Sequence, residues 1–530
     1  MRKCIFFISV LSVCFASCNQ DSMDAFLSNN ELEGNNEMLS EKKSLLDEVY
    51  LKEPDADFLR PFAKALYKAM EESPMLREII KTKALDKFNK EYDVLYQFIK
   101  DEPIEDGLTV RKLLSKHFEN EEKLAAIEAK HPTLTIFVPQ LPEDCFSAEN
   151  WNTAEQVPAV AIHPTRQRNT VVISQYGFFD EKSDEFVLEA GLIPAFPVVV
   201  IKDNTRVVVS QNSRSQYESL NNKNSDYVFD FADEFYDGSK ENSGLKSLWL
   251  TTTANNFDQK LIDAYNIYKN TDGWQRDYVY YGITPSNPNG KISFDFQESV
   301  IGFCFNSSNA SPEGMLQWLN DPLYNDPGPT LKPLTSAPDM AWTAGQWTFK
   351  VNAMIGNPEA GEIGTTKSGS FLAKPEDLFE VTYKKVTALV YIPQVTGFKL
   401  KKVNVNLMVW DLKYYSALIK ISVEKVNSGA TKTRAEASSS EFAGNLSFDA
   451  GWGAIVKWGL KFGASAKTTH SNSYQIQTTT KNLSLGETFV NFGEKVILSG
   501  PTTTGPVIMW DIRDYNLSLC KIMLAPMRVQ

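Results

Sequence analysis

Residues 445–467 read NLSFDAGWGAIVKWGLKFGASAK and alternate between apolar residues and polar or small ones. Every even-numbered position from 446 to 466 is apolar, and among the odd-numbered positions only Ile455 breaks the pattern. A period of two predicts extended chain with one apolar face and one polar face. Segments rich in serine and threonine flank the stretch at 432–440 and 468–480.

The constant parity of this stretch predicts a β-hairpin. A single strand of this length would exceed the usual size of roughly 3–10 residues. If the apolar residues are even-numbered in both arms of the hairpin, the loop must contain an odd number of residues. A two-residue loop would place the even-numbered residues of one arm on the same face as the odd-numbered residues of the other. Asp449, Ala450 and Gly451 fit a three-residue loop with glycine at the left-handed position, which pairs Phe448 with Trp452.

The apolar face of the predicted hairpin carries Trp452, Trp458 and Phe462. We expect this face to cover the core of a β-domain, since its small alanine and glycine positions suit tight sheet packing. The alternative is that these three residues enter a bilayer. The serine- and threonine-rich flanks and the amphipathic stretch resemble the C-terminal region of aerolysin-like pore-forming toxins, and a spanning strand needs only about 9–11 residues.

Length and composition restrict the class of protein. The chain has 530 residues, of which 42% are hydrophobic and 12% aromatic, and this is typical of globular domains. A chain of this length is expected to form about two to four domains. The net charge of −12 makes electrostatic capture of nucleic acid unfavourable, so no nucleic-acid partner is predicted. No internal apolar run is long enough to predict a transmembrane helix.

The N-terminus has the pattern of a secretory signal peptide. A basic start at 1–3 precedes an apolar run at 4–15. The tetrapeptide Phe15-Ala16-Ser17-Cys18 resembles the lipobox of bacterial lipoproteins, although phenylalanine replaces the usual leucine. The resemblance implies that Cys18 becomes the first mature residue and carries lipid, which anchors the protein to the outer membrane of the cell envelope. The alternative is an ordinary signal peptide with an incidental cysteine. Exposure to the periplasm or to the cell surface stays open.

Changes in hydropathy period predict an α+β fold, with an N-terminal helical segment, mostly antiparallel β domains after it, and a C-terminal region like a β-sandwich. The predicted segments are a signal peptide at 1–17, a flexible tether at 18–41, a helical domain at 42–130, a small β or mixed domain at 131–211, a linker or long loop at 212–255, and a helix with a large antiparallel β region at 256–530.

Local patterns predict individual elements. Ser73 and Pro74 form an N-cap and first helical position, and residues 93–100 are expected to continue that helix. Residues 202–205 predict a hairpin turn. Residues 274–282, WQRDYVYYG, predict an aromatic strand with a buried pair of Arg276 and Asp277.

Catalytic motifs are scarce. The four histidines, at positions 117, 131, 163 and 470, have no zinc-ligand spacing, and there is no G-x-S-x-G nucleophile elbow. A hydrolase without a recognisable motif therefore stays a third hypothesis, and we predict no enzyme. The mature cysteines Cys145, Cys304 and Cys520 are too few for a disulfide framework, and at most one bridge is expected.

Three acidic residues are weak candidates for calcium ligands. Asp321 and Asp326 lie in a loop rich in oxygen donors, WLNDPLYNDPGP, and Asp411 follows Trp410 at a predicted strand end. Such loops at the rim of a β-domain commonly hold calcium. The favoured interpretation is turn chemistry, in which Asn and Asp side chains cap the backbone. No other cofactor is predicted.

The chain as a whole resembles a group of secreted lipoproteins from Bacteroidetes-type bacteria that have no assigned activity. The resemblance rests on the lipobox and on four stretches, at 88–104, 193–200, 274–282 and 461–480. It implies an envelope location and assigns no catalytic residues. We therefore predict a cell-envelope lipoprotein with a non-catalytic binding or structural role and a glycan or protein ligand. Insertion of 445–467 into a membrane is the alternative.

Overall fold

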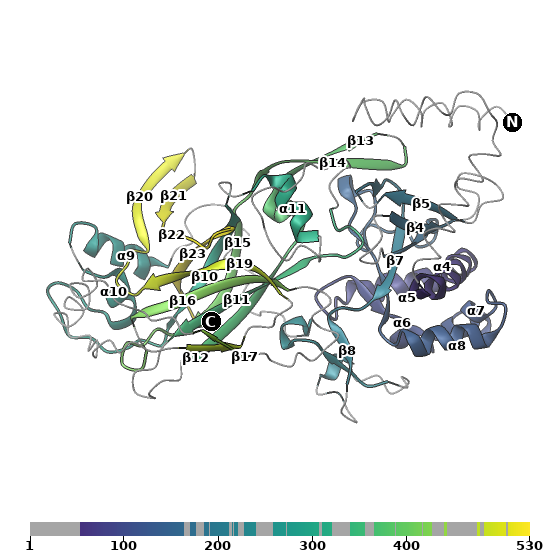
Figure 1. Ribbon diagram of the computed structural model, residues 1–530, viewed down its shortest axis with the longest axis horizontal. Helices are drawn as coiled ribbons and strands as arrows, with labels where there is room; N and C mark the ends of the chain where they lie inside the picture. The colour runs from purple at the N-terminus through teal and green to yellow at the C-terminus, as the bar shows by residue number, and fades with distance from the viewer. Residues whose placement is uncertain are drawn as a thin grey trace.

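The computed structural model describes most of the chain after residue 53 (Figure 1). It belongs to the α+β class, as predicted, with helices and largely antiparallel sheets. The stretch 445–467, which carries the predicted hairpin turn, lies outside the described residues. The described ranges are 54–163, 170–175, 185–189, 191–210, 215, 217–220, 227–239, 258–271, 273–306, 310–320, 340–355, 365–386, 388–415, 417–426, 439–442, 474–477, 482–504 and 507–529.

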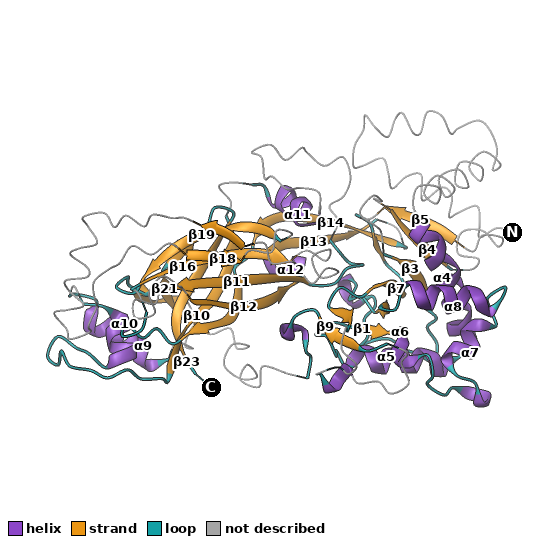
Figure 2. Cartoon of the chain, turned by 60° about the horizontal axis from the view of Figure 1, so that its bottom comes forward, coloured by secondary structure: helices purple, strands orange, loops and turns teal. Residues whose placement is uncertain are grey.

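A six-stranded sheet lies at one end of the molecule, and helices pack around it (Figure 2). Its strand order is β1-β2-β7-β3-β4-β5, and among the described pairs only β3 and β7 run parallel. The inner strands β2 and β3 are buried along their whole length, which matches their nearly continuous apolar sequences. We call this part the α/β unit. Its strands are β1 (Asp93–Leu95), β2 (Leu134–Phe137), β3 (Ala159–Ile162), β4 (Thr170–Ser174), β5 (Glu185–Glu189) and β7 (Val198–Asp203).

The helices of the α/β unit follow from capping residues and apolar spacing. Ser73 caps α5 (Pro74–Leu85) by accepting a hydrogen bond from the backbone N–H of Leu76, which confirms the predicted helix start. Leu76, Ile80 and Ala84 lie on one buried face at spacing four. The other helices are α4 (Pro54–Glu72), α6 (Tyr96–Ile99), α7 (Val110–Ser115) and α8 (Glu121–Lys130), with short 3₁₀ turns at Glu105–Gly107 and Pro142–Asp144.

Three local predictions were wrong. Residues 93–100 do not continue α5, because Asp93–Leu95 is the edge strand β1 and only Tyr96–Ile99 is helical. Residues 202–205 do not join a hairpin: β7 pairs with β2 and β3, while β8 (Val207–Val209) pairs with β9 (Phe229–Phe231). The third concerns the aromatic segment near Trp274, which is a helix and is described with the site.

Two four-stranded sheets form the other large part, the β-rich region (Figure 1). One has the order β15-β10-β23-β22 and the other β12-β11-β16-β19. Phe303 on β10 packs against Phe349 on β11 and Phe371 on β12, with ring centroids 5.2 and 5.3 Å away. The strands are β10 (Phe296–Phe305), β11 (Trp347–Ile355), β12 (Thr365–Ala373), β15 (Lys401–Met408), β16 (Leu418–Val426), β19 (Leu483–Asn491), β22 (Asp514–Asn516) and β23 (Cys520–Arg528).

Smaller elements complete the described chain. A three-stranded sheet, β13-β14-β6, joins the two parts and is discussed below. No helix among the described residues has both the length and the apolar character needed to cross a membrane. The remaining helices and strands are α9 (Gln259–Tyr268), α10 (Gln275–Tyr281), α11 (Pro312–Asn320), α12 (Pro375–Leu378), β6 (Ile193–Pro194), β13 (Phe379–Lys385), β14 (Val390–Phe398), β17 (Ser439–Phe442), β18 (Tyr474–Gln477), β20 (Ile497–Thr504) and β21 (Val507–Ile512), with 3₁₀ turns at Glu218–Leu220 and Glu234–Tyr236.

Candidate functional site

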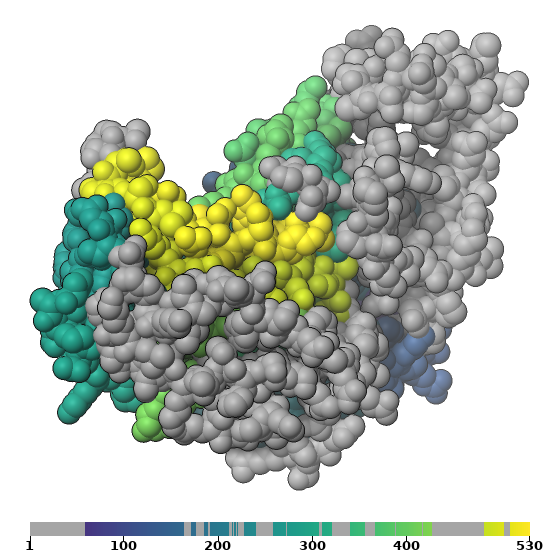
Figure 3. Space-filling model, turned by 60° about the vertical axis from the view of Figure 1, so that its left-hand side comes forward, coloured from purple at the N-terminus to yellow at the C-terminus, as the bar shows by residue number. Residues whose placement is uncertain are grey.

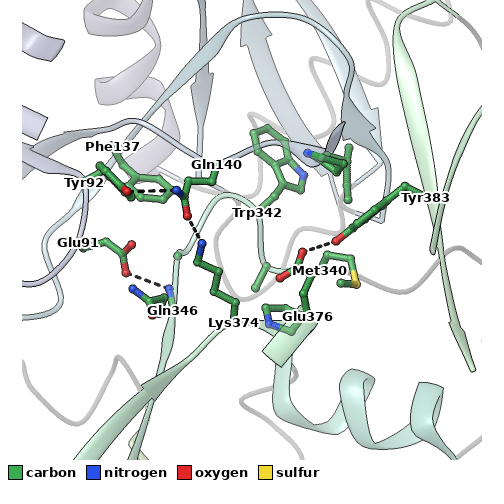
Figure 4. Close-up of a pocket in the computed structure, with 15 residues that line it drawn as sticks. Glu91, Tyr92, Phe137, Gln140, Met340, Trp342, Gln346, Lys374, Glu376 and Tyr383 are labelled. Carbon is green, nitrogen blue, oxygen red and sulfur yellow. Dashed lines mark hydrogen bonds between the residues drawn. The ribbon is translucent and has the colours of Figure 1, made fainter. Parts of the chain in front are cut away.

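A small hollow of about 50 Å³, lined by apolar and polar side chains, lies where the α/β unit meets the β-rich region (Figure 4). Pockets that enclose drug-sized ligands usually have volumes of about 300–1,000 Å³, so this hollow admits only a small group. Both parts of the molecule contribute to its wall. The lining residues include Glu91, Tyr92, Phe137, Gln140, Met340, Trp342, Gln346, Lys374, Glu376 and Tyr383.

One side of the hollow is the segment 340–346, which leads into β11. The α/β unit holds this segment mainly through its backbone. Lys202 Nζ donates to the carbonyl oxygen of Ala344 at 2.9 Å, and Arg206 Nη2 donates to that of Gln346 at 3.1 Å. In return, the backbone N–H of Gln346 donates to Glu91 Oε2 at 3.0 Å. We call this set of contacts the joint.

Arg206 and Glu91 form a buried ion pair at the centre of the joint. Arg206 Nη2 lies 3.0 Å from Glu91 Oε2, and the two side chains are only 7% and 5% exposed. Arg206 Nη1 also donates to the carbonyl oxygen of Asn89, and its guanidinium lies 5.4 Å from the ring centroid of Tyr236. Because a buried charge is costly without such partners, removing either member of this pair is strongly unfavourable.

A second buried pair lies beside the first. Lys202 Nζ is 3.3 Å from Asp93 Oδ1, and it sits 4.0 Å from the ring centroid of Phe137. The amides of Asn89 and Asn204 donate to Asp93 Oδ2 at 2.8 and 3.2 Å. The carboxylate is therefore paired and hydrogen-bonded, as a buried charge must be.

His163 adds a neutral contact to the joint. Its Nδ1 shares a 2.9 Å hydrogen bond with Thr343 Oγ1. Burial, together with the nearby charge of Lys202, lowers the pKa of His163 to about 4. The imidazole is therefore uncharged at neutral pH. It links the end of β3 to the segment 340–346 without adding a third positive charge to those of Lys202 and Arg206.

The rest of the hollow carries polar side chains from both parts of the molecule. Lys374 Nζ donates to Gln140 Oε1, and Gln140 Nε2 donates to the Tyr92 hydroxyl at 3.1 Å. The Tyr383 hydroxyl donates to Glu376, and burial, followed by the charge of Glu376, raises the pKa of Tyr383. Figure 4 shows these side chains facing Trp342 across the hollow.

Trp342 is the one lining side chain in the described structure whose buried polar atom lacks a hydrogen-bond partner. The residue is 7% exposed, and its indole N–H has no acceptor among the described residues. A buried donor without an acceptor is unfavourable by about 1–3 kcal/mol.

The hairpin β13–β14 makes a separate bridge to the α/β unit. The end of the hairpin that carries the turn pairs with β6, with Val390 opposite Pro194 and Tyr391 opposite Ile193. The backbone N–H of Ala195 donates to the carbonyl oxygen of Leu389 at 2.7 Å. The hairpin and the joint thus connect the two parts at different places.

Residues 274–282 were predicted to be a strand, but Gln275–Tyr281 is the helix α10. Gly282 ends it in the left-handed conformation, with φ of +69°. Arg276 and Asp277 are both fully buried, but they are not a pair. Arg276 donates through Nε and Nη2 to Glu298 on β10, and the Tyr280 hydroxyl donates to the same carboxylate at 3.1 Å.

Most predicted site residues fall outside the described ranges: Cys18, Asp321, Asp326, Trp452, Trp458 and Phe462. Asp411 is described and acts in a turn. Its Oδ1 accepts hydrogen bonds from the Tyr281 hydroxyl at 3.1 Å and from the backbone N–H of Lys413 at 2.9 Å. Within the described ranges, no three His, Cys, Asp or Glu side chains are grouped to hold a metal ion. The calcium site stays a prediction, because two of its three acids are not described.

The three mature cysteines are free thiols in this structure. Cys304 on β10 lies opposite Lys521, and Cys520 on β23 lies opposite Phe305. Adjacent positions of a strand face opposite sides of the sheet, so the thiols of Cys304 and Cys520 point away from each other. Burial raises the pKa of all three thiols, which keeps them protonated.

No pattern in the sequence predicted the joint. Glu91, Lys202, Arg206 and the segment 340–346 come from distant parts of the chain, and their partners follow from the topology. A signal was present in the strand VVVIKD at Val198–Asp203, where Lys202 interrupts an otherwise apolar and buried run. Comparisons of the chain with protein-family models, with curated proteins and with solved structures give no significant match.

Proposed function

We propose that the protein is a lipid-anchored component of the cell envelope with a non-catalytic binding or structural role. The signal peptide and the lipobox at Cys18 support the location. The observation that carries the role is the buried joint, which fixes the α/β unit against the β-rich region.

The joint favours a rigid platform over a clamp that opens and closes. To separate the two parts, the molecule would have to uncouple the Arg206–Glu91 and Lys202–Asp93 pairs from the segment 340–346. The ion pairs lie within the α/β unit and would stay intact, but three hydrogen bonds between their charged groups and the backbone of 340–346 would be lost. A hydrogen bond to a charged group is worth about 1.5–3 kcal/mol. A protein that binds a partner on a preformed surface needs no such movement.

A glycan or a protein side chain is the proposed ligand of this platform. The hollow offers an unpartnered indole donor on Trp342 beside the carboxylate of Glu376 and the aromatic ring of Tyr383. The volume of the hollow suits one terminal group of a larger ligand. We also infer that the two four-stranded sheets form a sandwich-like body, since the rings of Phe303, Phe349 and Phe371 pack between their strands.

Two experiments test this proposal. Metabolic labelling with radioactive palmitate should mark the wild-type chain and not the Cys18→Ser variant; an unlabelled wild type would remove the lipid anchor from the proposal. A glycan and peptide array should show binding that Trp342→Ala reduces at least tenfold. Phe294→Ala, which removes a 65% exposed aromatic side chain, is the matched control and should bind normally. The absence of any array ligand would leave a purely structural role.

A second candidate function is insertion of the stretch 445–467 into a membrane. The strands β17 and β18, which flank the stretch, pair antiparallel with Phe442 opposite Tyr474 and Ser440 opposite Ile476. Even-numbered residues therefore face even-numbered residues. The stretch itself lies outside the described residues, but the alternation in its sequence would place the apolar even-numbered positions of both arms on one face, as a membrane-inserting hairpin requires.

Dye release from liposomes tests the second candidate. Release of a dye from liposomes by the lipid-free chain should occur at micromolar protein and should be lost in Trp458→Asp. The exposed substitution Phe489→Asp, outside the stretch, is the control. No leakage by the wild type would exclude this candidate and leave the platform.

A further inference from the structure

The helix α10 holds the base of the hairpin β20–β21. Gln275 Oε1 accepts the backbone N–H groups of Val496 and Ile497 at 2.9 and 2.8 Å, and Gln275 Nε2 donates to the carbonyl oxygen of Ile497. The neighbouring Arg276 donates to the carbonyl oxygen of Glu494 at 3.0 Å. Two consecutive side chains of α10 thus fix the segment from which β20 begins.

The helix α9 makes a second contact with the same hairpin. Tyr265 on α9 packs edge-on against Trp510 on β21, with the ring centroids 5.5 Å apart. The hairpin stands out from the body of the molecule (Figure 1). Figure 3 shows its yellow strands at the surface beside the teal region that contains the two helices. The position of the hairpin therefore depends on how α9 and α10 are packed.

Asp277 is buried between these helices and lacks any compensating partner in the described structure. It is 0% exposed, and neither carboxyl oxygen has a hydrogen-bond partner among the described residues. An ionised carboxylate in such a place is strongly unfavourable, whereas the protonated form is tolerated. In agreement, burial raises the pKa of Asp277 to about 7.

The titratable groups that face Asp277 do not stabilise its charge. They are Tyr268 from α9 and Tyr281 from α10 itself, and the nearby carboxyl contributes to raising the pKa of both phenols. The Tyr268 hydroxyl donates to the carbonyl oxygen of Ile283, and that of Tyr281 donates to Asp411. From β10, Glu298 is paired with Arg276. No described cation compensates a charge on Asp277.

We propose that Asp277 is a proton-operated latch. The neutral carboxyl lets α10 pack against α9 and hold the base of β20–β21. Loss of the proton to solvent places an uncompensated charge in the helix interface, which loosens α10 and with it the hairpin. The latch thereby sets how firmly the base of β20–β21 is held. It is independent of the proposed platform and of its ligand.

Hydrogen exchange of the purified chain at pH 5.5 and pH 8.5, with times scaled for the intrinsic rate, tests the latch. If opening gives Asp277 its ordinary pKa of 3.8, the opening constant of α10 should rise roughly thirtyfold between these two pH values. The rise should appear in peptides that cover Gln275–Tyr281 and Ile497–Ile512. Peptides from β2 and β7 should not change.

Two variants complete the test. Asp277→Asn keeps the shape and removes the titration, so the pH dependence of α10 should vanish. Asp263→Asn on α9 is the control, because this carboxylate is hydrogen-bonded to Gln259 and partly exposed. This variant should keep the pH dependence of α10. An equal rise in Asp277→Asn, or no rise in the wild type, would overturn the latch. If Asp277→Asn does not fold, the exchange data of the wild type are sufficient to test the proposal. A rise of the opening constant in peptides from β2 and β7 that is similar to the rise in α10 also contradicts the proposal.

Discussion

Replacing Glu91 by glutamine should destabilise the protein severely through the joint. Glutamine keeps the size of the side chain but removes the charge that compensates Arg206, which is 7% exposed. The guanidinium is then left buried with only carbonyl oxygens as hydrogen-bond partners. Breaking a buried pair in this way should lower the free energy of unfolding by about 3–5 kcal/mol.

Urea denaturation followed by tryptophan fluorescence measures this effect, and Trp342 lies beside the pair as a reporter. The double variant Glu91→Gln/Arg206→Met removes both charges, so it should be more stable than Glu91→Gln alone. The control is Asp514→Asn, which breaks the ion pair with Lys521, where the side chains are 50% and 39% exposed. That change should be worth less than about 1 kcal/mol. If Glu91→Gln lowers the free energy of unfolding by less than about 1 kcal/mol, the joint does not have the proposed energetic role.

Three further predictions concern Asp277, two glycines and the three described cysteines. Asp277 keeps its proton to about pH 7 when folded but titrates near 3.8 when unfolded, so its contribution to stability is lost as the pH rises from 4 to 7; Asp277→Asn should therefore raise the free energy of unfolding by up to roughly 4 kcal/mol at pH 8 and leave it unchanged at pH 3. Gly486 has φ of +115°, and an added Cβ would lie 1.3 Å from the carbonyl oxygen of Leu517; Gly486→Ala should destabilise the protein by at least about 3 kcal/mol. Gly107→Ala, where φ is +70° and nothing lies within 4 Å, should lower stability by only about 1 kcal/mol, and equal losses in both variants would contradict the packing around β19. Alkylation of the denatured mature chain without reductant should label Cys145, Cys304 and Cys520, and a Cys304–Cys520 disulfide in the mass spectrum would contradict the register of β10 with β23.

Local signals in the sequence predict local structure well. Ser73 and Pro74 predict the start of α5 because a side-chain oxygen and a fixed φ act on the next few residues only. The aromatic run at 274–282 misleads, since its residues favour strands by propensity. The contrary signal was Gly282 at the end of the run, which is a typical C-cap, together with the spacing of Arg276, Val279 and Tyr280 on one buried side.

The candidate site could not be predicted in the same way. The contact of Arg206 with Glu91 spans 115 residues, and that of Gln346 with Glu91 spans 255. No periodicity relates such positions, because their proximity depends on the order of strands in the sheet and on the path of segment 340–346. The burial of Arg276 was predicted, but its partner Glu298 lies on β10 and follows from tertiary packing alone.

The distance between the two parts of the molecule tests the central claim of a rigid platform most directly. Spin labels at the exposed Glu122 on α8 and Lys402 on β15, with the three native thiols replaced by alanine, report this distance by pulsed electron spin resonance. The joint predicts one narrow distance distribution in the wild type and a broad one in Glu91→Gln. A broad or two-peaked distribution in the wild type would contradict the account.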